Sequence, residues 1–177
     1  MTMSPADVLH DGHGTDETRS VKDGRLPKQL GDFGEALAMV VLGQMLGFRV
    51  ALVDHEGADL IASKGDTRLA VSVKTRRFVT DDPSLVFETP NPEKLTLFAE
   101  SFGLEPAVAF VMIDGDFTTI DLYFLTLEAL NRYANDPTAA GFGTRKGGAY
   151  ISNAPRNQAS LQSLDGVQHR RLTVSKP

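Results

Sequence analysis

Cysteine is absent from this 177-residue chain, which excludes disulfide bridges and thiolate metal ligands. The chain also lacks any apolar run near the roughly 18 residues that a membrane-spanning helix needs. Residues 1–20 have neither a basic start nor an apolar segment, so they do not resemble a secretory signal. Together these absences lead us to expect a cytoplasmic protein with no membrane partner.

An excess of positive charge is lacking too, because 23 acidic residues outnumber 18 basic ones and give a formal net charge of -5. This balance argues against a general nucleic-acid coat protein, since non-specific binding depends on a basic surface. It is compatible with a nuclease that has a local basic strip, because acidic metal ligands lower the total. The remaining composition, 41% hydrophobic and 23% charged, is ordinary for one globular domain.

The chain divides by composition into three parts of one domain. Residues 1–25 are polar and predict a disordered N-terminal arm, so we interpret His10 and His13 as incidental rather than as metal ligands. Residues 26–136 hold the periodic segments and form the expected core. Residues 137–177 are a Gly/Ser-rich C-terminal extension of the same domain, with strand candidates at 149–151 and 171–174.

The core pattern predicts an α/β fold with the order α-β-β-β-α-β-β-α. Residues 106–113 are almost wholly apolar, which is typical of a central strand buried on both faces. A central mixed sheet flanked by helices on both sides follows. The expected helices are 27–46, 93–102 and 127–134, the strands are 48–53, 58–63, 68–74, 106–113 and 118–125, and 79–92 is a loop.

The first helix has an apolar stripe at three- and four-residue steps that we expect to face the core. Glu35 lies off that stripe, on a face whose small residues would let another backbone come close. The members of the stripe are Leu30, Phe33, Leu37, Val40 and Val41. The face of Glu35 holds Gly31, Ala38, Met39 and Leu42.

The most informative stretch is residues 57–77, GADLIASKGDTRLAVSVKTRR, which predicts two short strands joined by a tight turn. Because side chains alternate along a strand, Leu69, Val71 and Val73 would face the core and Lys74 the other side. There Lys74 could meet Asp59 across the hairpin. A carboxylate beside a lysine at the end of a strand pair is the minimal equipment for metal-assisted phosphodiester hydrolysis.

Three segments, GDFGEALA on the first helix, GADLIA on the second strand and VSVKTRR on the third, occur in this element order. With them, residues 30–134 resemble the core of the PD-(D/E)XK nuclease superfamily, the restriction-endonuclease-like fold. The resemblance is strongest to its archaeal Holliday-junction-resolvase and small restriction-enzyme branches. It implies a metal-dependent endonuclease that hydrolyses DNA phosphodiester bonds, branched or duplex, by direct water attack. It is also compatible with a homodimer.

The resemblance implies a role for each matching residue. Asp59 would be the main ligand of Mg²⁺ or Mn²⁺, and Glu35 would assist from the helix. Lys74 would orient the attacking water and stabilise charge on the phosphate. The carbonyl of Val73 would be a neutral ligand. Ser72 stands where the family has its second strand-three acid.

Three interpretations of Ser72 remain open from the sequence. Glu35 and Asp59 suffice and the enzyme is active, or another acid takes the place of the missing one. Otherwise the domain is catalytically inactive and binds nucleic acid or a partner protein. The candidates for a replacement acid, by proximity in the sequence, are Asp54, Glu56 and Glu88.

Basic and polar residues near the motif are candidates for binding nucleic acid, because arginine grips phosphates with two hydrogen bonds. The alternative for each is plain solvated charge. The segment GFGTRKGG is not a phosphate loop, since it lacks the required lysine spacing. The candidates are Thr75, Arg76 and Arg77 after the lysine, Arg145 and Lys146 in GFGTRKGG, and the cluster His169, Arg170 and Arg171.

Overall fold

The computed structural model describes residues 25–79, 83–145 and 147–174, except for the side chains of Arg25 and Asp54. The arm expected at residues 1–25 lies outside this range apart from the backbone of Arg25, and so does Lys146. Within the described residues, no helix is both long and apolar enough to cross a membrane.

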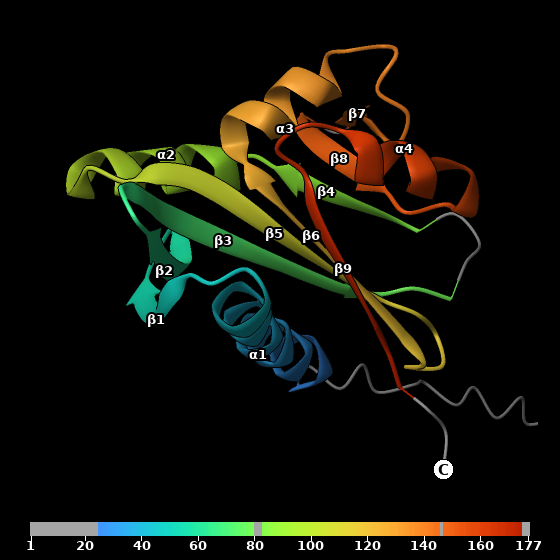
Figure 1. Cartoon of the computed structure of the whole chain (residues 1–177), viewed down its shortest axis with the longest axis horizontal. Coiled ribbons are helices and arrows are strands. Elements are labelled where there is room, and N and C mark those ends of the chain that lie inside the picture. Colours follow the sequence, from blue (N-terminus) through green and yellow to red (C-terminus); the bar gives the residue numbers. More distant parts are fainter. Residues whose placement is uncertain (1–24, 80–82, 146, 175–177) are drawn as a thin grey trace, which may run out of the picture.

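A six-stranded sheet forms the centre of the fold, with the strand order β1-β2-β3-β5-β6-β9 (Figure 1). Strands β3 and β5 pair in parallel, whereas all the other neighbours are antiparallel, so the sheet is mixed as the sequence predicted. The strands are β1 (Arg49–His55), β2 (Ala58–Lys64), β3 (Thr67–Arg77), β5 (Glu105–Ile113), β6 (Thr119–Thr126) and β9 (Gln168–Thr173).

A second, antiparallel sheet has the order β4-β8-β7, with β4 (Ser84–Glu88), β8 (Gly148–Ser152) and β7 (Phe142–Arg145). The expectation that 79–92 is wholly a loop was wrong, because β4 occupies its middle. Within β4, buried Leu85 and Phe87 alternate with more exposed neighbours. The partner strand β8 lies about sixty residues later in the chain, so local sequence gave little indication of the pairing.

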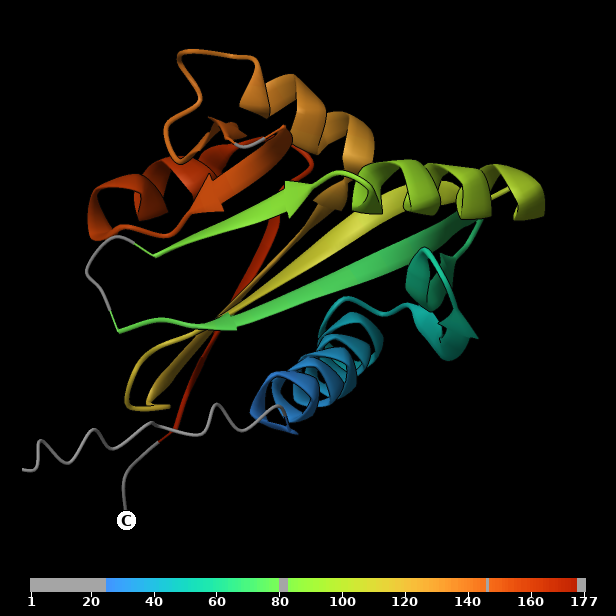
Figure 2. The same ribbon diagram turned by 180° about the vertical axis from the view of Figure 1, so that it is seen from behind.

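Helices cover the two faces of the central sheet unequally. Among the described residues, one face is covered by α1 (Arg25–Val40), which continues into the π-helical turn η1 (Val41–Met45) (Figure 1). The opposite face carries α2 (Asn91–Phe102), α3 (Leu127–Ala134) and the second sheet (Figure 2). The 3₁₀ turn η2 (Pro155–Asn157) and α4 (Gln158–Ser163) lead from the second sheet into β9. Each face has its own apolar core, so the predicted fold class is confirmed.

The side of α1 that faces the sheet differs from the predicted one. Phe33 and Val40 of the expected stripe are 43% and 52% exposed, whereas Ala38 and Leu42 are fully buried. The expectation that the apolar stripe as a whole faces the core was therefore wrong. The small face packs instead because it lets the helix backbone approach β3 more closely than large side chains would allow.

Candidate nuclease site

Asp59 is fixed at the point where the β2–β3 ladder ends. The last ladder pair there is Leu60 with Val71. Beyond that pair, the side chain of Asp59 accepts hydrogen bonds from β3. Its Oδ2 accepts from the Val73 amide at 2.6 Å and from the Ser72 hydroxyl at 3.3 Å. Two donors from β3 therefore hold one carboxylate oxygen at the edge of the hairpin.

Lys74 is held from the other side of the site, by β4 and α2. Its Nζ donates to Asn91 Oδ1 at 3.5 Å and lies 5.6 Å from the centre of the Phe87 ring. Asn91 is itself oriented, because its Nδ2 donates to the carbonyl of Glu88 at 2.9 Å. Sequence reasoning missed Asn91 and Phe87, since the only available signal was an Asn-Pro step at a helix start.

Glu35 extends toward the site from α1, and the pKa of its carboxyl is shifted by the groups around it. Partial burial raises the pKa of the Glu35 carboxyl, and repulsion from Asp59 and Asp32 raises it further, while Lys74 lowers it. Asp59 and Lys74 therefore each lie close enough to Glu35 for their charges to interact with it. Lys74 donates its hydrogen bond to Asn91 and not to Asp59, so the contact between Asp59 and Lys74 stays a prediction.

Ser72 is 4% exposed, and its hydroxyl donates a hydrogen bond to the Asp59 carboxylate. Two of the three candidate replacement acids, Glu56 and Glu88, have described side chains, and both are exposed. Glu56 is exposed and pairs with Lys94 on α2. The Glu88 side chain is exposed, and this residue holds Asn91 through its backbone carbonyl. The Asp54 side chain is outside the described part, and no group of three or more His, Asp or Glu side chains suited to a metal occurs among the described residues.

The donor set at this site suits a hard, hydrated cation. Two carboxylates, Glu35 and Asp59, repel each other, and the Val73 carbonyl is on the adjoining strand. Mg²⁺ prefers oxygen ligands, keeps several waters and is commonly held by one or two carboxylates. A divalent cation between the carboxylates would relieve their repulsion. The residues therefore fit Mg²⁺ or Mn²⁺ with fewer protein charges than three acids would give.

The residues after Lys74 differ in what they offer to a phosphate. Thr75 Oγ1 is buried against α1 and has no partner among the described residues. Arg77 donates from Nε to the Gly115 carbonyl at 3.0 Å and stacks on Phe117. Arg76 is exposed and, two residues after Lys74 on one strand, shares its face about 7 Å away.

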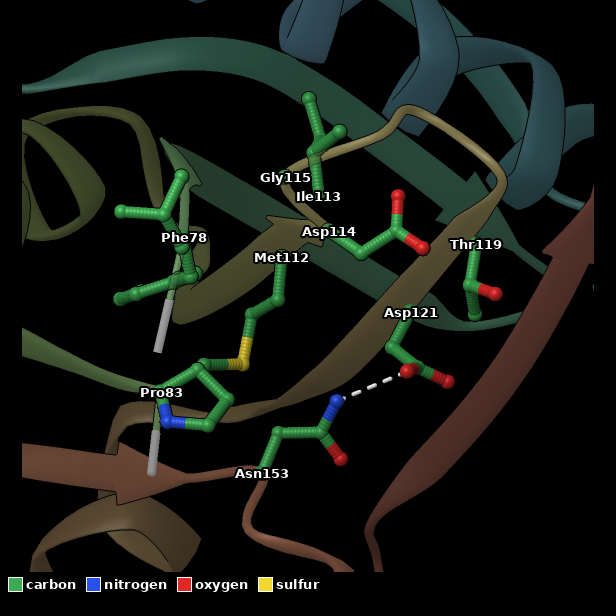
Figure 3. Close-up of a pocket in the computed structure, with 10 residues that line it drawn as sticks. Phe78, Pro83, Met112, Ile113, Asp114, Gly115, Thr119, Asp121 and Asn153 are labelled. Atoms are coloured by element: carbon green, nitrogen blue, oxygen red, sulfur yellow. Dashed lines mark hydrogen bonds between the residues drawn. The ribbon is translucent and has the colours of Figure 1, made fainter. Parts of the chain in front are cut away.

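The basic cluster near the C-terminus serves the fold instead. Arg171 binds the Asp121 carboxylate with two hydrogen bonds, at 2.8 and 2.9 Å, and His169 Nε2 lies 2.7 Å from the same group. Burial alone would raise the Asp121 pKa, but hydrogen bonds from His169, Arg171 and Asn153 lower it to about 2. Figure 3 shows Asp121 and Asn153 at the wall of a cavity of about 260 Å³. Both side chains are already satisfied by neighbours.

Comparisons with known proteins were made at three levels. No protein-family model matches the chain, and no curated protein matches it. Among solved structures, it is similar to Hjc, a Holliday junction resolvase from Archaeoglobus fulgidus. That similarity spans 70% of this chain and 84% of Hjc, with 21% sequence identity and a TM-score of 0.46. A similarity this low assigns neither a family, an activity nor any residue role to this chain.

Proposed function

We propose that this protein is a Mg²⁺- or Mn²⁺-dependent endonuclease that hydrolyses DNA phosphodiester bonds by direct water attack. The observation that supports this most is the arrangement around Asp59. Its carboxylate, anchored by the Val73 amide, lies on the edge of β2 within electrostatic reach of Glu35, and Lys74 also interacts with Glu35. Two acids and one lysine are the groups that metal-assisted phosphodiester cleavage requires.

In this proposal each side chain has one task. Asp59 and Glu35 hold the cation, and Ser72 and the Val73 amide keep Asp59 oriented. The cation, when bound, supplies Lewis acidity toward the phosphate. Lys74 donates hydrogen bonds to the attacking water or to a non-bridging phosphate oxygen, and its charge stabilises the negative charge that develops there. Asn91 positions Lys74 through the contact at 3.5 Å.

A second candidate is a catalytically inactive nuclease-like domain that binds nucleic acid or a partner protein. Ser72 favours it, because a neutral hydroxyl replaces a carboxylate and already donates to Asp59. One negative charge fewer weakens the attraction for a divalent cation. The preference for branched or duplex DNA, and the homodimer that the resemblance allows, stay predictions in either case.

Cleavage of supercoiled plasmid and of branched DNA in Mg²⁺ and in Mn²⁺ tests the proposal. We expect Lys74→Ala and Asp59→Asn each to reduce cleavage about 100-fold or more. Arg68→Ala is the control, since Arg68 is an exposed cation on the same strand, near the hairpin turn. Cleavage that survives both substitutions contradicts the proposal. Mn²⁺ binding without cleavage by the wild type favours the inactive domain.

A further inference from the structure

A concave surface on the second sheet is separate from the candidate nuclease site. It encloses about 560 Å³ and is lined by residues of β4, β7, β8 and η2. Along β4 and β8, Leu85, Phe87 and Ile151 point into the core, so Ser84 and Tyr150 lie on the opposite, outward face. Arg145 of β7 shares that outward face, because it lies in register with Gly148.

The lining of this concavity is unusual for a chain with a net charge of -5. It contains two arginines, Arg145 and Arg156, and no carboxylate. Every side chain that lines it is polar apart from one glycine, and hydroxyls come from Ser84, Thr144, Tyr150 and Ser152. Such a surface offers hydrogen-bond donors and the positive charge of Arg145 to a ligand.

Two of these donors are not used within the described part of the chain. The Arg145 guanidinium and the Tyr150 hydroxyl make no hydrogen bond or ion pair with any described residue. A guanidinium whose donors are available can form two parallel hydrogen bonds to one oxyanion. A tyrosine hydroxyl beside it adds a third donor.

Tyr150 is held in place by a glycine on the neighbouring strand. Gly143 is its register partner on β7. A Cβ at Gly143 would lie 2.7 Å from Tyr150 Cε1 and 2.8 Å from its hydroxyl oxygen. The ring therefore lies across the glycine backbone, and this contact fixes the direction of the hydroxyl.

We propose that this concavity is an oxyanion site that holds a backbone phosphate of DNA, with Arg145 and Tyr150 as its main donors. This inference rests on the proposed function, because a second depression, of about 490 Å³, extends from Arg145 to Thr89 and Pro92. Those residues flank Asn91, which contacts Lys74. The second depression shares Thr144 and Arg145 with the first and also has Glu93 in its lining, so Arg145 lies at the junction of the two.

The test measures binding of inorganic phosphate and of a short single-stranded oligonucleotide, both without divalent metal. The variants are Arg145→Ala and Tyr150→Phe, and Arg68→Ala is the matched control for loss of one exposed cation. We expect Arg145→Ala to weaken both interactions about tenfold or more, since it removes charge-assisted hydrogen bonds. It should also lower the slope of log K against log salt for DNA by about 1. Tyr150→Phe should weaken both interactions severalfold, and Arg68→Ala should bind phosphate as the wild type does.

Each outcome decides between occupants. Weaker binding of both probes supports a phosphodiester at this site. Weaker phosphate binding with unchanged DNA binding overturns the nucleic-acid occupant and assigns a free oxyanion instead. Unchanged binding of both probes overturns the site altogether. A wild type that cleaves no DNA contradicts the proposed function alone, whereas phosphate binding that does not depend on Arg145 contradicts this inference alone.

Discussion

Gly34 of α1 and Thr75 of β3 touch so closely that only glycine fits on the helix side. A Cβ at Gly34 would lie 1.7 Å from Thr75 Oγ1 and 2.8 Å from Thr75 Cβ. Gly34 immediately precedes Glu35, and Thr75 immediately follows Lys74. This contact therefore fixes the separation of the two segments that bring Glu35 and Lys74 to the candidate site.

Gly34→Ala should push α1 away from β3, because the added methyl group overlaps Thr75. We expect a loss of about 1–3 kcal/mol in the free energy of unfolding, as for overpacked cores, together with weaker Mn²⁺ binding. Urea unfolding and Mn²⁺ titration measure the two effects. In Thr75→Gly the space is free, so adding Gly34→Ala to that variant should cost little. An equal cost in both backgrounds would show that the contact does not set the helix position.

Thr75→Ala should change the free energy of unfolding by less than about 1 kcal/mol. The substitution removes a hydroxyl that is buried without a partner among the described residues, and this gain offsets the loss of the methyl contact. Chemical denaturation measures the change, and Thr67→Ala, at an exposed position of the same strand, controls for the change in strand propensity. A much larger loss in Thr75→Ala would mean that the hydroxyl has a partner in solution.

Ser72→Asp should restore the charge that the resemblance leads one to expect. Without metal we expect it to destabilise the fold by about 1–3 kcal/mol, because a second carboxylate is buried beside Asp59. With Mn²⁺ the order should reverse, and Tm should rise more than in the wild type, since the cation compensates both charges. Ser72→Asn is the neutral control. A Tm of Ser72→Asp that does not respond to Mn²⁺ would argue against a metal at this position.

Asp121→Asn should be among the most destabilising single changes, at about 2–3 kcal/mol. The substitution removes one of the two carboxylate oxygens that accept the bidentate hydrogen bonds of Arg171. The donors of Arg171, His169 and Asn153 then compete for the single remaining amide oxygen. Thermal unfolding at neutral pH measures the loss. Asp116→Asn, at an exposed position of the β5–β6 turn, is the comparison and should change Tm much less.

The same carboxyl predicts how stability depends on acid. The pKa of Asp121 is about 2 in the folded protein, against about 3.9 for an ordinary aspartate. Because the folded pKa is the lower one, its stabilisation is complete above about pH 4 and disappears as the pH falls toward 2. About 2 kcal/mol should be lost over that window. The free energy of unfolding of Asp121→Asn should fall correspondingly less in that window, which urea melts at several pH values would detect.

The sequence alone determined the order of elements from α1 to α3, apart from β4, and the hairpin that holds Asp59 and Lys74. Those features depend on short-range rules: alternation along a strand, glycine at turns, and an apolar run that must be buried. The cap of α3 is similarly local, since the Ala129 amide donates to the hydroxyl of Thr126, three residues earlier, at 3.1 Å. The placement of Glu35 off the apolar stripe of the first helix was also readable from periodicity.

Only the tertiary structure decided which face of that helix packs and what surrounds Lys74. Phe33 looks like a core residue in a periodic pattern, yet the close approach at Gly34 turns it outward, because backbone contact excludes large side chains there. Asn91, which begins α2, contacts Lys74. The strand β4 just before it pairs with β8, which lies about sixty residues later in the chain. Arg145 and Tyr150 belong to the local β7–β8 hairpin, but the pairing of β8 with the distant strand β4 decides which face of that hairpin turns outward.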